Sequence, residues 1–219
     1  MMNKFIFKLV LIIAAFALAI TMTACSFSLS KQEKDAVKAF RDVLTVLPAE
    51  EKNGWYQIIS PDGGAKFVFS NDCAGVAVDA VPFITAGLDA GVLDNVYESV
   101  FYKSDLGFSL PSWDMLNRNV KDTALAQFEA DIKYFKTNVN NDTGHFSINF
   151  NDAVFEWAND IKGNKHGIVF TLNPEPLIAA GVDPEKVEGW NYVQVSVEVN
   201  GKTEQVWRFQ KTIDLSDLI

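Results

Sequence analysis

Cysteine and histidine are both scarce in this chain of 219 residues, which holds two of each. The two histidines, His145 and His166, have no cysteine pair and no His–Glu spacing beside them, so the sequence offers no ligand set for zinc. The segments 140–142 and 149–152 are rich in Asn and Asp, but they lack the alternation and the closing Glu of a calcium loop. We therefore expect no metal site and no cofactor, and we predict that both segments are turns.

Signatures of catalysis are also missing. No serine lies in a Gly-x-Ser-x-Gly turn, and Gly63-Gly64 is typical of a hairpin turn rather than of a phosphate-binding loop. Cys73 lies in a strand-like stretch and is predicted to be a small buried residue. We name no catalytic residue, although two of the 28 acidic residues could still meet in the folded protein and form a glycosidase pair.

An excess of basic residues is absent too. The chain has 19 Lys and Arg against 28 Asp and Glu, a net charge of −9. Nucleic acids and anionic lipid surfaces both need basic patches, so the composition argues against either partner. The acidic surface suits a cationic or neutral partner, or is solvated charge with no further role.

The one long apolar run lies at the N-terminus. Lys4 and Lys8 precede an uncharged stretch, Leu9–Ile20, and a small residue followed by cysteine, Ala24-Cys25, comes soon after. A positive start, an apolar middle and a small residue before a cleavage point are typical of a secretory signal peptide. The segment resembles the lipobox of bacterial lipoproteins, with Met22 where that family usually has Leu.

The resemblance implies that residues 1–24 are removed, that Cys25 carries a diacylglycerol on its thiol, and that residues 25–29 form a short tether. Each buried CH₂ contributes about 0.8 kcal/mol, so two or three acyl chains give a durable membrane anchor. The globular part would then lie outside the cytoplasm, on the cell membrane or the outer membrane. In Gram-negative members, a residue other than Asp after the cysteine, here Ser26, implies the outer membrane. An ordinary cleaved signal peptide and an uncleaved membrane helix over residues 5–23 remain alternatives.

Without residues 1–25, which hold two lysines and no acidic residue, 17 basic and 28 acidic residues remain, a net charge of −11. The hydrophobic content of this part is that of a folded protein.

The most informative feature of residues 26–219 is self-similarity. Three blocks recur later in the chain in the same order. Residues 36–40 and 65–72 recur 88 positions later, at 124–128 and 153–160, and residues 82–89 recur 94 positions later, at 176–183. We predict a duplication with six inserted residues, giving a first unit at 30–111 and a second at 112–219.

Each unit is predicted to contain a helix, a hairpin, a strand, a short helical turn and a second hairpin. The helix after Ser30 has one apolar stripe and ends before Pro48, and its counterpart covers about 122–137. Strands are expected at 55–59, 65–70, 74–81, 96–103, 107–110, 145–150, 153–158 and 167–172. Asn200-Gly201 predicts a type I′ turn between the last two strands. The fold class is therefore α+β: two tandem units packed as a pseudo-twofold pair, with a cleft at their join.

Aromatic side chains indicate candidate ligand-lining residues. Trp157 takes the place of Phe69 in the duplication and is predicted to lie in the core. Trp190 follows a glycine at a strand start, where partial exposure is expected, so Trp190 and Asp160 are our candidate ligand-binding residues. The sequence favours a noncatalytic envelope lipoprotein that binds an envelope protein or a small ligand. An envelope-polymer hydrolase that uses carboxylates and an accessory lipoprotein of an uptake system are the alternatives.

Overall fold

A computed structural model describes residues 28–52, 54–70, 73–89, 100–102, 120–199 and 201–219. Residues 31–219 form one compact unit. The elements of the compact unit are α2 (Lys31–Val46), β1 (Ala49–Lys52), β2 (Trp55–Ile59), β3 (Ala65–Phe69), β4 (Ala74–Val78), α3 (Val81–Thr85), β5 (Val100–Tyr102), α4 (Val120–Asp131), β6 (Asn138–Val139), β7 (Phe146–Asn149), β8 (Ala153–Trp157), β9 (Ile168–Leu172), α5 (Glu175–Ala179), a 3₁₀ turn (Pro184–Lys186), β10 (Asn191–Val199) and β11 (Lys202–Ile213). Among these helices, none has both the length and the apolar character needed to cross a bilayer.

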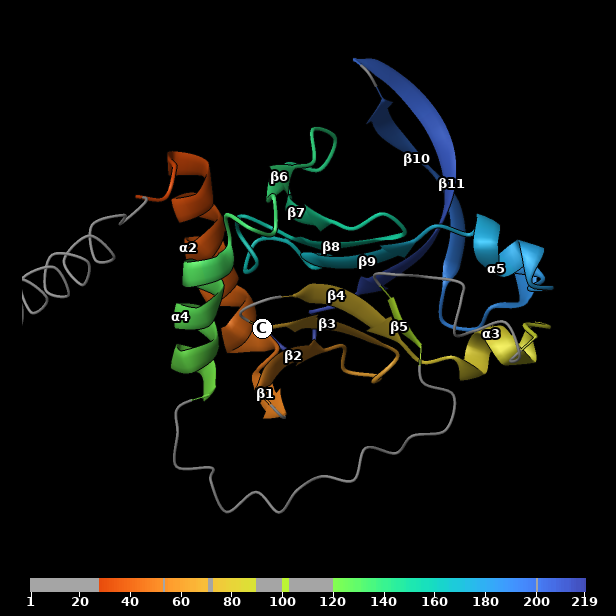
Figure 1. The fold of residues 1–219 in the computed structure, drawn as a ribbon, viewed down its shortest axis with the longest axis horizontal. Helices are drawn as coiled ribbons and strands as arrows, with labels where there is room; N and C mark the ends of the chain where they lie inside the picture. Colours follow the sequence, from red (N-terminus) through yellow and green to blue (C-terminus); the bar gives the residue numbers. More distant parts are fainter. Residues whose placement is uncertain (1–27, 53, 71–72, 90–99, 103–119, 200) are drawn as a thin grey trace, which may run out of the picture. The chain divides into compact units, whose positions relative to one another are not determined.

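The strands form two sheets, with orders β1-β2-β3-β4-β5 and β10-β11-β9-β8-β7-β6 (Figure 1). All pairings are antiparallel except β4 with β5. Helices together with mostly antiparallel sheets confirm the α+β class.

The predicted apolar stripe of the first helix is confirmed, because its members Val37, Phe40, Val43, Leu44 and Leu47 are all buried. Helices α2 and α4 run side by side (Figure 1), with the Phe40 and Phe128 rings stacked at 3.8 Å between centroids. The two sheets contribute stacked rings to the same core: Phe67 and Phe155 lie 4.4 Å apart and nearly parallel. Trp157 is fully buried, as predicted, and its indole N–H donates to the Ala36 carbonyl of α2 at 3.3 Å.

The hairpin–strand portions of the two sheets share one register. In β3–β4, Ala65 pairs with Val78 and Phe69 with Ala74. In β8–β9, Ala153 pairs with Leu172 and Trp157 with Ile168. Residues of β8 lie 88 positions after their counterparts in β3, and residues of β9 lie 94 after those in β4, the same separations that the sequence blocks have.

The short helices α3 and α5 meet at the turns that end them. Gly87 and Gly181 both have positive φ, +106° and +100°. The N–H of Asp89 donates to Ala180 O at 3.0 Å, and the N–H of Asp183 donates to Ala86 O at 2.8 Å. A Cβ on Gly87 would lie 2.7 Å from Gly181 O, and a Cβ on Gly181 would lie 2.9 Å from Gly87 O. The two Ala-Gly-x-Asp turns therefore pair reciprocally, and both need glycine.

Some expectations were wrong. Two short strands, β1 and β6, follow the long helices and were not predicted. They have four and two residues, which is too few to show the alternation of apolar and polar side chains that marks a strand. Helix α4 ends at Asp131, earlier than expected. Of the hairpin expected at 96–110, only β5 falls among the described residues, where it runs parallel to β4.

The predicted cleft does not run along the whole join. Between the two sheets, the stacked Phe67–Phe155 rings and the paired glycine turns fill the space, because both inner sheet faces are aromatic and bury each other. A pocket does lie between the two halves elsewhere, where α2 faces the β6–β7 hairpin. Cys73 is exposed rather than buried, since it lies in the turn before β4 and not in the strand.

Candidate functional site

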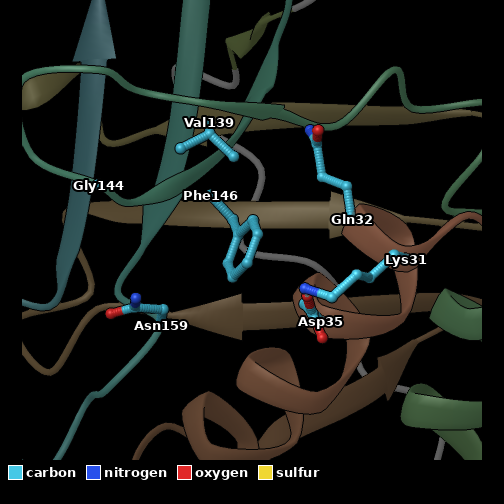
Figure 2. A pocket seen from close by; sticks show the side chains of 7 residues that line it. All are labelled: Lys31, Gln32, Asp35, Val139, Gly144, Phe146 and Asn159. Atoms are coloured by element: carbon cyan, nitrogen blue, oxygen red, sulfur yellow. Dashed lines mark hydrogen bonds and ion pairs between the residues drawn. The ribbon is translucent and has the colours of Figure 1, made fainter.

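A pocket of about 430 Å³ lies between the first turn of α2 and the β6–β7 hairpin. Both apolar and polar residues line it: Lys31, Gln32, Asp35, Val139, Gly144, Phe146 and Asn159. Figure 2 shows the Phe146 ring at the centre, with α2 residues on one side and Asn159 on the other. Lys31 Nζ lies 2.9 Å from Asp35 Oδ2, so the nearest two charges neutralise each other at the rim. A pocket of this size fits a small ligand that has an apolar part and hydrogen-bonding groups.

A buried polar cluster lies beside the same hairpin, centred on Glu156 of β8. Asn140 Nδ2 donates to both carboxylate oxygens, at 3.1 and 3.3 Å. His145 Nδ1 lies 3.8 Å from Glu156 Oε2 and makes no hydrogen bond, while its Nε2 lies 3.0 Å from Asn164 Nδ2. Phe155 and Trp157 on either side of Glu156 belong to the core, so strand alternation directs this carboxylate to the other face of the sheet.

Burial sets the protonation of this pair. Desolvation raises the pKa of Glu156 above its usual range, against the opposing effect of the Asn140 hydrogen bond. Desolvation lowers the pKa of His145. Both shifts favour the uncharged forms, which weakens any ion pairing between His145 and Glu156.

Lys211 of β11 forms a second buried polar group, with a side chain only 8% exposed. Its Nζ forms an ion pair with Asp62, in the turn between β2 and β3, and donates to Gly189 O at 3.2 Å. Burial raises the pKa of Asp62, but hydrogen bonds from Lys211, Ser60 and the Gly64 N–H outweigh it, and the pKa lies below its ordinary value. Lys211 therefore joins the hairpin turn of the first sheet to the second sheet.

The two residues predicted to line a ligand site contact different elements. Trp190 is buried, at 7% exposure, and packs against Phe83 with Lys211 Nζ 5.8 Å from its ring. Its expected partial exposure was wrong, because α3 and β11 cover the indole. Asp160 is exposed in the turn after β8 and accepts from the Gly163 N–H at 3.2 Å. A ligand-binding role for either residue stays a prediction.

The buried carboxylates have separate partners. Asp131 bonds with Gln127 inside α4, whereas Glu156 accepts from Asn140. Neither lines the pocket of Figure 2. Across the described ranges, no three His, Cys, Asp or Glu side chains gather closely enough to hold a metal ion.

Sequence reasoning missed the Glu156 cluster and the Lys211 ion pair. His145 lies in the loop just before β7, and the fold buries it against β8. A single signal was available: Glu156 is a charged residue inside an otherwise apolar strand, where only a partner makes burial tolerable.

Comparison with protein-family models, with curated proteins and with solved structures gives no match for this chain.

Proposed function

We propose that this protein is an exported lipoprotein, held to a bacterial membrane by acyl chains on Cys25, that binds a partner or ligand without catalysis. The observation that carries the proposal is the N-terminal sequence, in which two lysines, an uncharged apolar run and Ala24-Cys25 follow in the order of a lipobox signal.

The pocket supports a binding role close to that anchor. Its α2 wall begins at Lys31, six residues after Cys25, so the chain between them spans about 20 Å at most. A ligand in this pocket would be an envelope component or a small molecule near the membrane surface. The carboxylate hydrolase alternative would need two acids facing one groove, and the two buried acids described above each have their own partner.

We also propose that residues 30–111 and 112–219 are duplicated units that pack about a pseudo-twofold axis. Contacts between equivalent residues are what such an axis produces. Phe40 stacks on Phe128 and Phe67 stacks on Phe155, both separated by 88 residues in the chain. Gly87 meets Gly181 in the same manner, at a separation of 94.

Expression of the full chain in a bacterial host, followed by mass spectrometry of membrane fractions, tests the anchor. We expect the mature N-terminal peptide to begin at Cys25 and to carry a diacylglycerol. Cys25→Ser should leave the full-length precursor, whereas Cys73→Ser, the matched control, should be processed normally. An unmodified Cys25 thiol, or residues 1–24 still attached in wild-type material, contradicts the proposal.

Crosslinking in intact cells tests the binding role. A photoreactive residue at Val139, on the rim of the pocket, should capture an envelope component more strongly than one at Tyr134, an exposed residue that does not line the pocket. Equal and low capture at the two positions, together with an unchanged envelope after gene deletion, would refute it.

A further inference from the structure

The hairpin of β10 and β11 extends beyond the sheet to which it belongs (Figure 1). β10 pairs with β11 over its whole length, from Asn191 opposite Gln210 to Val199 opposite Lys202. β11 pairs with β9 only from Phe209 to Ile213. Residues 202–208 thus have no third strand among the described residues, and the ribbon projects from the sheet with Gln194, Gln205 and Trp207 exposed.

One face of the ribbon has an uncommon composition for an exposed surface. Pairing places Tyr192 opposite Phe209, Gln194 opposite Trp207, and Ser196 opposite Gln205, with Thr203 beyond them on the same side of β11. We call these seven residues the Trp207 face. None of the seven is charged, and Gln194, Thr203 and Gln205 are exposed.

The aromatic residues of this face run from the core to the surface. Phe209 is fully buried against Phe83, with ring centroids 5.5 Å apart. Tyr192 lies 5.5 Å from Phe209 and stacks on Trp207 at 4.4 Å, with the two rings nearly parallel. Trp207 remains 45% exposed. The exposed indole is therefore held in place by packing rather than free to rotate, which reduces the entropic cost of binding.

The chemistry of this surface matches a neutral sugar polymer. The C–H groups of a pyranose face are weakly positive and pack on the negative face of an indole ring. Amide and hydroxyl side chains beside the indole can both donate to and accept from sugar hydroxyls. Gln205 already donates to Ser196 Oγ at 2.7 Å, which leaves the Gln205 carbonyl and the Ser196 hydroxyl hydrogen available. Nucleic acids and anionic lipids would need basic groups, and this face has none.

We propose that the Trp207 face binds a neutral oligosaccharide along the β10–β11 ribbon. The proposal rests on the proposed function, since export is what brings an envelope polysaccharide within reach. The proposed ligand-binding tryptophan is not the one predicted from the sequence. Trp190 is buried, whereas Trp207 is exposed and can contact a ligand.

The test is titration of the full-length, ¹⁵N-labelled protein in detergent micelles with chitotetraose, cellotetraose and maltoheptaose, followed by NMR of the tryptophan indole N–H groups. Trp207→Phe assigns the Trp207 signal. We expect at least one sugar to shift it, and Trp207→Ala to weaken binding by about tenfold or more, the loss expected for one stacked ring.

Val206→Thr is the matched control, because Val206 is the adjacent residue on the opposite face of the ribbon and should leave affinity unchanged. Trp207 stacks on Tyr192 but is 45% exposed, so Trp207→Ala should stay folded, and a cooperative thermal melt close to that of the wild type shows that lost binding is not lost folding. No shift with any of the three sugars, equal affinity in Trp207→Ala, or a shift caused only by phosphatidylglycerol vesicles would overturn the proposal. Mass spectrometry of Cys25 reports on the anchor separately, so failure of sugar binding and failure of lipidation are distinguishable.

Discussion

The reciprocal glycine turns give the sharpest prediction about this fold. Gly87→Ala adds a Cβ that would lie 2.7 Å from Gly181 O, closer than such contacts occur in proteins. The oxygen belongs to the backbone, so relief requires the two turns to separate. Gly63→Ala is the matched control: φ is also positive, +73°, but no atom lies within 4 Å of the added Cβ.

The two substitutions share the conformational cost of alanine at positive φ, about 1–2 kcal/mol. Gly87→Ala adds the loss of the two hydrogen bonds that join the turns, Asp89 N–H to Ala180 O and Asp183 N–H to Ala86 O. Each contributes about 1 kcal/mol net. We therefore expect Gly87→Ala to lower the free energy of unfolding by about 3–4 kcal/mol, against about 1–2 kcal/mol for Gly63→Ala.

Urea denaturation followed by far-UV circular dichroism measures this difference. With an m value of about 2 kcal/mol/M, the midpoint should fall by roughly 1.5–2 M for Gly87→Ala and by less than about 1 M for the control. Gly181→Ala should match Gly87→Ala, and the double variant should cost less than the sum because one separation relieves both contacts. If Gly87→Ala costs no more than Gly63→Ala, the close approach is absent; if only one of the two glycines is sensitive, the reciprocal pairing is wrong.

Three further predictions concern buried charge and the free thiol. Asp62→Asn should destabilise the protein by about 1–2 kcal/mol, because it leaves the buried Lys211 charge without its partner; the figure is discounted because Asp62 is 56% exposed. Lys211→Met should be nearly neutral, because it removes the buried charge and leaves behind only the half-exposed Asp62, which water can solvate. Equal losses in chemical denaturation would contradict this. Glu156→Gln should raise the melting temperature at pH 7 and have no effect below pH 4. Because folding raises the pKa of Glu156, its contribution to wild-type stability is complete below the ordinary carboxyl pKa of 4.5 and is lost as the pH rises through the folded-state pKa. A gain in melting temperature that persists at pH 3 would refute the raised pKa. Cys73 should react with a maleimide in the native protein, and lipidated Cys25 should not, so two labelled thiols in mature material would count against the anchor.

Most secondary structure could be predicted from the sequence because local patterns set it. The apolar stripe from Val37 to Leu47 fixed the buried face of α2, and Asn200-Gly201 fixed the register of the last hairpin, in which Val199 pairs with Lys202. The sequence repeats at separations of 88 and 94 residues recur as equal strand registers.

The candidate sites could not be predicted in the same way, because they depend on contacts between distant segments. Periodicity cannot tell which indole ends up covered. Trp190 and Trp207 both lie beside strands, yet α3 covers the first, while the second lies where β11 has passed the end of β9. Glu156 and His145 become a pair only because the β6–β7 loop turns back over β8.

The sequence by itself determined the α+β class and the order of the main elements, since both follow from residues that are neighbours in the chain; the export signal stays a prediction from the sequence. Tertiary structure alone decided that the join between the two halves is packed between the sheets and leaves a pocket where α2 faces the β6–β7 hairpin. Aromatic side chains on both inner sheet faces gain more from burying each other than from lining a cleft, and two glycines let the backbones meet at the far end.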